Sequence, residues 1–155
     1  MSGAVAPAGQ NENVRAAISR ASDATGVDFS LLIQTAQRES GLNPNARANT
    51  SSATGLFQFI DSTWLDMVRR HGAEHGLGGY AQALQSGGVD AATRRQILSL
   101  RNDPEIAARM AAELARENAS ALQARLGRAP SSGELYAAHV MGADGAARLI
   151  QASAN

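Results

Sequence analysis

Apolar residues recur along most of the chain at spacings of three and four positions, as they do on one face of a helix. In the segment 29–40, for example, Phe29, Leu32, Ile33 and Ala36 lie at positions i, i+3, i+4 and i+7. Runs that alternate between apolar and polar residues, as strands do, are missing. The pattern therefore predicts a nearly all-helical fold.

Capping residues divide this pattern into separate helices. Gly26 is placed to end the first, and Asp103-Pro104 is a suitable N-cap and first-turn pair for a long one. The glycine-rich segment 72–88 predicts an irregular excursion, with at most one helical turn at 80–84, that could close over a cleft as a lid. Residues 1–12 are expected to form a flexible tail, and residues 13–155 a single domain. The predicted helices span residues 13–25, 29–40, 61–70, 90–101, 104–126, 132–140 and 146–152, with a turn at 142–145 before the last.

Composition excludes several classes of function. The 14 Lys and Arg balance the 14 Asp and Glu, so no overall basic field favours nucleic acid or an anionic membrane surface as partner. The absence of cysteine excludes thiol catalysis and cysteine-ligated zinc. We expect no membrane span, since no run reaches about 18 apolar residues. The N-terminus shows no pattern typical of an export signal.

Glu39 lies at an unusual position for a carboxylate. It follows Leu32 by seven residues and Ala36 by three, which places it on the apolar stripe of its helix. It also lies in the last helical turn, where unpaired carbonyls carry partial negative charge. Both effects favour the neutral acid, which is what a general acid needs near neutral pH. The alternative is that Glu39 caps the helix or pairs with Arg38 or Arg47 at the surface.

Three segments carry a resemblance to a known family. ESGLNPNA at 39–46, ATGLFQF at 53–59 and LYAAHVMGADGA at 135–146 resemble, in order and spacing, the motifs of the soluble lytic transglycosylases, whose fold is similar to that of goose-type lysozyme. The resemblance extends over residues 18–150. It implies an all-α, lysozyme-like helical domain with roughly six to eight helices around a glycan cleft and little or no β-structure.

The resemblance also assigns roles to residues of the first two motifs. Glu39 would be the catalytic acid and afterwards the base, and Ser40 would position the acid or the N-acetyl group of the substrate. Gln58 would line the sugar cleft, and Gly55 would allow the backbone to approach the glycan closely. Phe57 stands where the family usually has Met and keeps an apolar contact of different shape.

The third motif departs further from the family pattern. Aligned on Gly142, it places His139 at the family's cleft Tyr and Val140 at its Asn. Either His139 makes the hydrogen bond of that Tyr, which is the interpretation we favour, or Tyr136 reaches the same place from one turn earlier. In the alternative without function, Tyr136 belongs to the core and His139 bonds a backbone carbonyl.

The chain offers no obvious second catalytic carboxylate. Glycosidases of the usual kind need two, about 5–5.5 Å apart for retention or about 6.5–9.5 Å for inversion. Residues 42–59 contain no Asp or Glu, while Asp61 and Asp66 suit a helix start and a solvent face. Glu117 and Asn118 could face the cleft, although an exposed helical Glu is commoner. A nucleophile within the substrate is then the economical mechanism, and the family implies the C6 hydroxyl of N-acetylmuramic acid, which yields a 1,6-anhydromuramoyl end.

Two other functions fit the same motifs: a lysozyme-type muramidase that hydrolyses the same bond, and an inactive glycan-binding or assembly module. We expect no cofactor and no metal, because Gly72 and Gly76 should interrupt the helix that would bring His71 and His75 together. Trp64 is expected in the core. The expected partner is the glycan strand of peptidoglycan, bound by a monomer in the periplasm or cell envelope. Secretion, flagellar or phage machinery could deliver the domain only through parts that the sequence does not contain.

Overall fold

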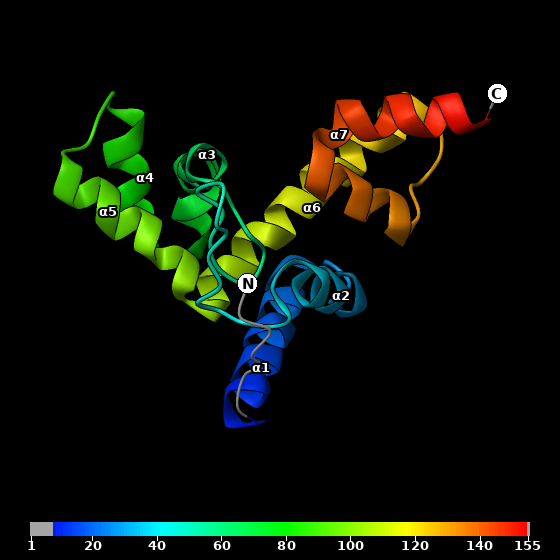
Figure 1. The fold of residues 1–155 in the computed structure, drawn as a ribbon. Helices are drawn as coiled ribbons and strands as arrows, with labels where there is room; N and C mark the ends of the chain where they lie inside the picture. The colour runs from blue at the N-terminus through cyan, green and yellow to red at the C-terminus, as the bar shows by residue number, and fades with distance from the viewer. Residues whose placement is uncertain (1–7, 155) are drawn as a thin grey trace.

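A computed structural model describes residues 8–154, which fold almost entirely into helices (Figure 1). Within that range the β-structure is limited to isolated bridges, which join Arg47 to Thr54 and Thr54 to Phe59. The all-α prediction is confirmed. The helices are α1 (Ala8–Thr25), α2 (Phe29–Ser40), α3 (Asp61–His71), α4 (Gly78–Gln85), α5 (Ala91–Ser99), α6 (Pro104–Leu126) and α7 (Ser132–Ala154), with short 3₁₀ helices η1 (Gly72–His75) and η2 (Leu100–Asn102).

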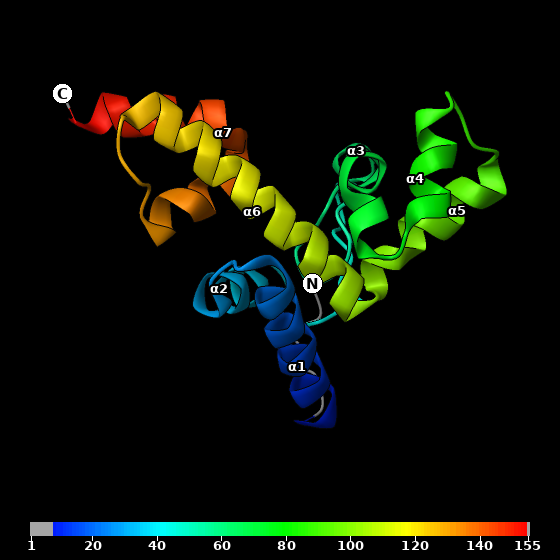
Figure 2. The same ribbon diagram turned by 180° about the vertical axis from the view of Figure 1, so that it is seen from behind.

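The long helix α6 organises the molecule. Figures 1 and 2 show α3 beside its N-terminal half, with α4 and α5 on the far side of α3, and α7 beside its C-terminal half; α1 packs against α6 as well. The predicted cap is present, because the Asp103 carboxylate accepts hydrogen bonds from the backbone N–H groups of Glu105 and Ile106, both at 3.0 Å. Gly127, at φ 73°, ends the helix in the left-handed conformation that glycine favours.

Buried side chains form two separate clusters. The larger joins α1, α2, the 41–60 loop, α3, α5 and the first half of α6, and it includes Ile18, Leu32, Trp64 and Met110. The smaller lies between α6 and α7, around Leu122, Ala138, Ala146 and Ala147. Trp64 is completely buried, and its indole N–H donates to the Ile97 carbonyl at 2.8 Å. It therefore belongs to the core, as predicted.

Several predicted boundaries are wrong. The first helix begins at Ala8 rather than at residue 13, so residues 8–12 of the predicted tail are helical, while residues 1–7 lie outside the described part. The predicted excursion at 72–88 instead contains η1 and α4, because Leu77 and Ala81 are buried and α4 packs on α3. The predicted turn at 142–145 is a single kink in α7 at Gly142. No helix of residues 8–154 is both long enough and apolar enough to cross a membrane.

Candidate active site

Glu39 is the penultimate residue of α2, and its side chain is half-buried. Its neighbours on the helix, Ala36 and Ser40, are buried, so Glu39 lies at the edge of the apolar face rather than inside the core. Gly41, at φ 64°, ends the helix immediately afterwards. Glu39 therefore belongs to the last turn of α2, and its side chain remains accessible to a substrate.

The partner of Glu39 is Tyr136, 97 residues further along the chain. The Tyr136 hydroxyl, on α7, donates to Glu39 Oε2 at 3.0 Å. Burial raises the pKa of Tyr136, and so do its hydrogen bond to Glu39 and the charge of that residue. The hydroxyl therefore stays protonated at neutral pH. Arg38 does not pair with Glu39 but lies over the Tyr136 ring, with its guanidinium carbon 4.8 Å from the ring centre.

His139, one helical turn after Tyr136, has a different partner. Its Nε2 lies 3.0 Å from the carbonyl oxygen of Phe57, so Nε2 carries the proton and donates it. The His139 ring also meets the Phe59 ring edge-on, with centroids 6.2 Å apart. The interpretation favoured from the alignment is thus corrected: Tyr136 makes the hydrogen bond to Glu39, because its turn of α7 faces α2, and His139 ties α7 to the 41–60 loop.

Gly55 and Gln58 shape that loop. Gly55 has φ 86°, and a Cβ there would lie 2.2 Å from the Arg101 carbonyl oxygen, so the close approach that requires glycine is to the protein's own backbone. The Gln58 amide nitrogen donates to the carbonyls of Ala46 at 3.2 Å and Gly55 at 2.9 Å. Arg101 holds the loop from the other side by donating to the carbonyls of Ser52 and Phe59, each at 2.9 Å.

Ser40 and Phe57 are more buried than their predicted roles suggest. The Ser40 hydroxyl donates to the Ala36 carbonyl at 3.0 Å and accepts from the Asn43 N–H at 3.2 Å, so it secures the end of α2. The Phe57 side chain is only 1% exposed. Both residues therefore stabilise the structure around the site.

A pocket of about 260 Å³ lies between the 41–60 loop, α6 and α7. It brings together Phe57, Gln58 and His139 from the predicted set, and Asn118 contributes a nearly buried amide from α6, whereas Glu39 and Tyr136 are not among its lining residues. A larger cavity of about 750 Å³, bordered by α1, η1 and α6, contains none of the predicted site residues. The smaller pocket is therefore the better candidate for the sugar cleft. Its walls are Phe57, Gln58, Phe59, Ile60, Thr63, Leu114, Asn118, Ala138, His139, Val140 and Gly142.

The other candidate carboxylates are paired with cations. Asp61 binds Arg101 at 2.9 Å, and Asp66 binds Arg69 at 2.7 Å and Arg70 at 2.9 Å. The Glu117 carboxylate accepts from the Arg70 guanidinium and from Nε2 of His71. Glu39, by contrast, accepts a hydrogen bond from a neutral hydroxyl.

Comparison with known families identifies the family of the chain. The sequence model of the transglycosylase SLT domain matches residues 16–152, which is most of the chain. The chain therefore belongs to the transglycosylase SLT domain family, and the resemblance carried by the three motifs is confirmed. At family level this membership implies lytic transglycosylase-type action on peptidoglycan, a component of the cell envelope.

Proposed function

We propose that this protein cleaves the β-1,4 bond between N-acetylmuramic acid and N-acetylglucosamine and leaves a 1,6-anhydromuramoyl end, with Glu39 as acid and then base. The observation that carries the proposal is the contact between the half-buried Glu39 carboxylate and the neutral Tyr136 hydroxyl. Successive turns of α7 contact both parts of the site: Tyr136 bonds Glu39, and His139 bonds the loop that carries Gln58. One element thus connects both motifs that the family implies for catalysis.

The reaction needs one carboxyl group that changes its protonation state twice. Protonated Glu39 gives its proton to the glycosidic oxygen, the bond from that oxygen to C1 breaks, and C1 acquires oxocarbenium character. The Glu39 carboxylate then takes the proton of the C6 hydroxyl while the C6 oxygen bonds to C1. No water is consumed, and Glu39 is again protonated. Tyr136 donates its hydrogen bond to the carboxylate in the interval, when the negative charge is present.

Two alternatives use the same cleft. A muramidase would need a positioned water and usually a second carboxylate, but Asp61, Asp66 and Glu117 are all paired with cations. An inactive glycan-binding module would not need an acid that forms no ion pair among the described residues. Because peptidoglycan lies in the cell envelope, the proposal includes action in the periplasm or cell envelope, and it includes action as a monomer.

Digestion of purified sacculi followed by mass analysis of the muropeptides tests the function. Wild type should release anhydro products one water lighter than hydrolytic products, and Glu39→Gln should release almost none. Reducing-end products from wild type would replace the proposal with the muramidase. Sacculus binding by both proteins without any product would indicate the module.

A further inference from the structure

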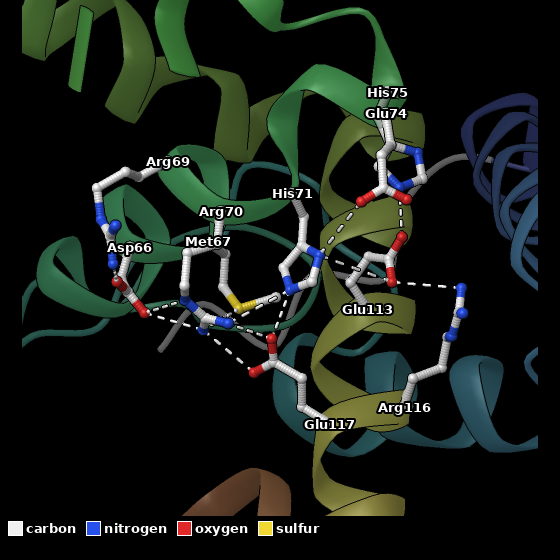
Figure 3. Close-up of polar contacts among 10 residues, drawn as sticks. All are labelled: Asp66, Met67, Arg69, Arg70, His71, Glu74, His75, Glu113, Arg116 and Glu117. Carbon is white, nitrogen blue, oxygen red and sulfur yellow. Dashed lines mark hydrogen bonds and ion pairs between the residues drawn. The ribbon is translucent and has the colours of Figure 1, made fainter. Parts of the chain in front are cut away.

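A second polar cluster, remote in sequence from the motifs above, joins α3 and η1 to α6 (Figure 3). His71 ends α3, and Glu74 and His75 follow in η1, which continues the chain in a helical path despite Gly72. Glu113 and Glu117, one turn apart on α6, face them. The α-helix does end at His71, as predicted, but the 3₁₀ helix η1 follows directly, so both histidines still contact the same face of α6.

His75 is fully engaged in this cluster. A guanidinium N–H of Arg109 lies 3.3 Å from its Nδ1, and a guanidinium can only donate, so Nδ1 is the acceptor. The proton of the ring is therefore on Nε2, which donates to Glu113 Oε2 at 2.7 Å. Both side chains are 5% exposed. A neutral His75 thus fixes the orientation of the buried Glu113 carboxylate.

One ring nitrogen of His71, Nδ1, makes no hydrogen bond to any described residue. Its Nε2 contacts both the Arg70 guanidinium, at 3.4 Å, and the Glu117 carboxylate, which is closer. Because the closer partner can only accept, that nitrogen carries a proton. Its Nδ1 points toward Glu74 Oε1 at 3.8 Å and Glu113 Oε1 at 4.0 Å, too far for hydrogen bonds. Among the described residues Glu113 Oε1 has no hydrogen bond either, although its side chain is 95% buried. The nearest cation to it is Arg116 at 3.4 Å, whose side chain is 55% exposed and which a bound ion would displace.

We propose that His71 Nδ1, Glu113 Oε1 and Glu74 Oε1 bind one divalent ion of the zinc class. The three ligand atoms all lie within 4.8 Å of one another. Ligands at about 2.0–2.2 Å from a tetrahedral ion are about 3.3–3.6 Å apart, so small side-chain adjustments complete the site. Imidazole with carboxylates suits zinc, whereas magnesium and calcium prefer oxygen ligands alone.

The surroundings support a cation at this place. Glu117 behind Nε2 of His71 reproduces the carboxylate–histidine–metal arrangement that orients metal-bound imidazoles. Because the ligands come from α3, η1 and α6, the ion would brace these elements against one another. Glu39 is not among the ligands, so the ion has a structural role.

The test uses the full chain without a histidine tag, stripped with a chelator. Calorimetric titration should show one Zn²⁺ per wild-type chain, and Co²⁺ in its place should give visible absorption. Zn²⁺ should also raise the melting temperature. The His71→Gln variant keeps an N–H donor toward Glu117 but lacks Nδ1, and we expect Zn²⁺ affinity at least tenfold weaker. His139→Gln is the matched control and should bind Zn²⁺ like wild type.

Glu113 is buried, so Glu113→Gln could destabilise the fold, and Glu74→Gln at an exposed ligand provides the second variant. Circular dichroism of each variant verifies that it is folded. Equal Zn²⁺ affinity in wild type, His71→Gln and Glu74→Gln would overturn the proposal, as would a wild type that binds neither metal at millimolar concentration. Nitrogen NMR gives a further decisive result, because a His71 ring protonated on both nitrogens and unresponsive to Zn²⁺ would also overturn it. Sacculus digestion by the metal-free protein tests the proposed function independently of the proposed metal site.

Discussion

Glu39 and Glu117 are both helical glutamates with a partner far away in sequence, yet their surroundings differ. Glu117 accepts from Arg70 and His71, and although burial acts to raise its pKa, these hydrogen bonds and charges lower it. Glu39 accepts from the neutral hydroxyl of Tyr136, while Arg38 lies over the ring of that Tyr. A carboxylate tied to cations is held as an anion and is a poor proton donor. The comparison therefore separates a structural acid from one that remains available for proton transfer.

The largest expected effect comes from the same substitution made at both positions. Glu39→Gln should lower the rate of sacculus digestion at least a hundredfold, because general acid–base catalysis contributes about 10²–10⁴-fold. Glu117→Gln should leave most of the activity, since that carboxylate is bonded to Arg70 and His71 of α3. Turbidity clearing of purified sacculi, with melting temperatures for both variants, measures the difference. Comparable losses in two folded variants would mean that the distinction between the two acids is wrong.

The next largest effect is expected from a substitution in the 41–60 loop. In Gly55→Ala the new Cβ would meet the Arg101 carbonyl at 2.2 Å, at a φ of 86° that side chains rarely adopt. Strain at such a position costs about 1–3 kcal/mol before the clash is counted, so we expect unfolding to become easier by at least about 2 kcal/mol. Activity should fall too, because the loop carries Gln58.

Gly79→Ala is the matched control for that variant, since no atom lies within 4 Å of a Cβ at Gly79. Denaturant unfolding should show it within about 0.5 kcal/mol of wild type. A Gly55→Ala protein as stable as wild type would show that the 41–60 loop can shift away from Arg101, and that the loop is not the rigid wall inferred for the cleft.

Local signals in the sequence were sufficient for the helices that position Glu39. The spacing of Leu32 and Ala36 predicted α2, and Asp103-Pro104 predicted the start of α6, because capping and one-sided burial are encoded within a few residues. The family motifs then led to Glu39 and to the Gln58 loop. These features depend on neighbours in sequence, and for that reason they could be found without a structure.

Tertiary packing decided the features that the sequence did not reveal. Gly72 and Gly78 looked like helix breakers, but burial of Leu77 and Ala81 against α3 outweighs the modest helix penalty of glycine. Alignment on Gly142 could not show which turn of α7 faces α2, so it favoured His139 over Tyr136. The pairs of His71 and His75 with α6 join residues about 40 positions apart, for which no local pattern exists.

A smaller effect should follow when only the hydrogen bond to Glu39 is removed. Tyr136→Phe keeps the ring beneath Arg38 and deletes the donor, and a hydrogen bond to a charged group contributes about 1.5–3 kcal/mol. If part of that is realised in the carboxylate state during the reaction, the rate should fall about tenfold or less. Tyr80→Phe, which removes a hydroxyl 3.4 Å from Gln96, is the control and should have wild-type activity. An unchanged rate in Tyr136→Phe would show that the hydrogen bond from Tyr136 to Glu39 does not contribute to the reaction.

The smallest expected effect is the contribution of Glu117 to folding stability, which depends on pH. The folded state holds the Glu117 pKa below its unfolded value of about 4.3, so its contribution to stability is present above that pH and is lost as the pH falls toward the folded pKa. The side chain is 33% exposed, which limits the contribution to about 1 kcal/mol. Denaturant unfolding of wild type and Glu117→Gln at a series of pH values should show a gap at neutral pH that closes on acidification. A gap that stays constant, or that widens in acid, would mean that Arg70 and His71 do not stabilise the Glu117 anion, and the contrast with Glu39 would lose its electrostatic basis.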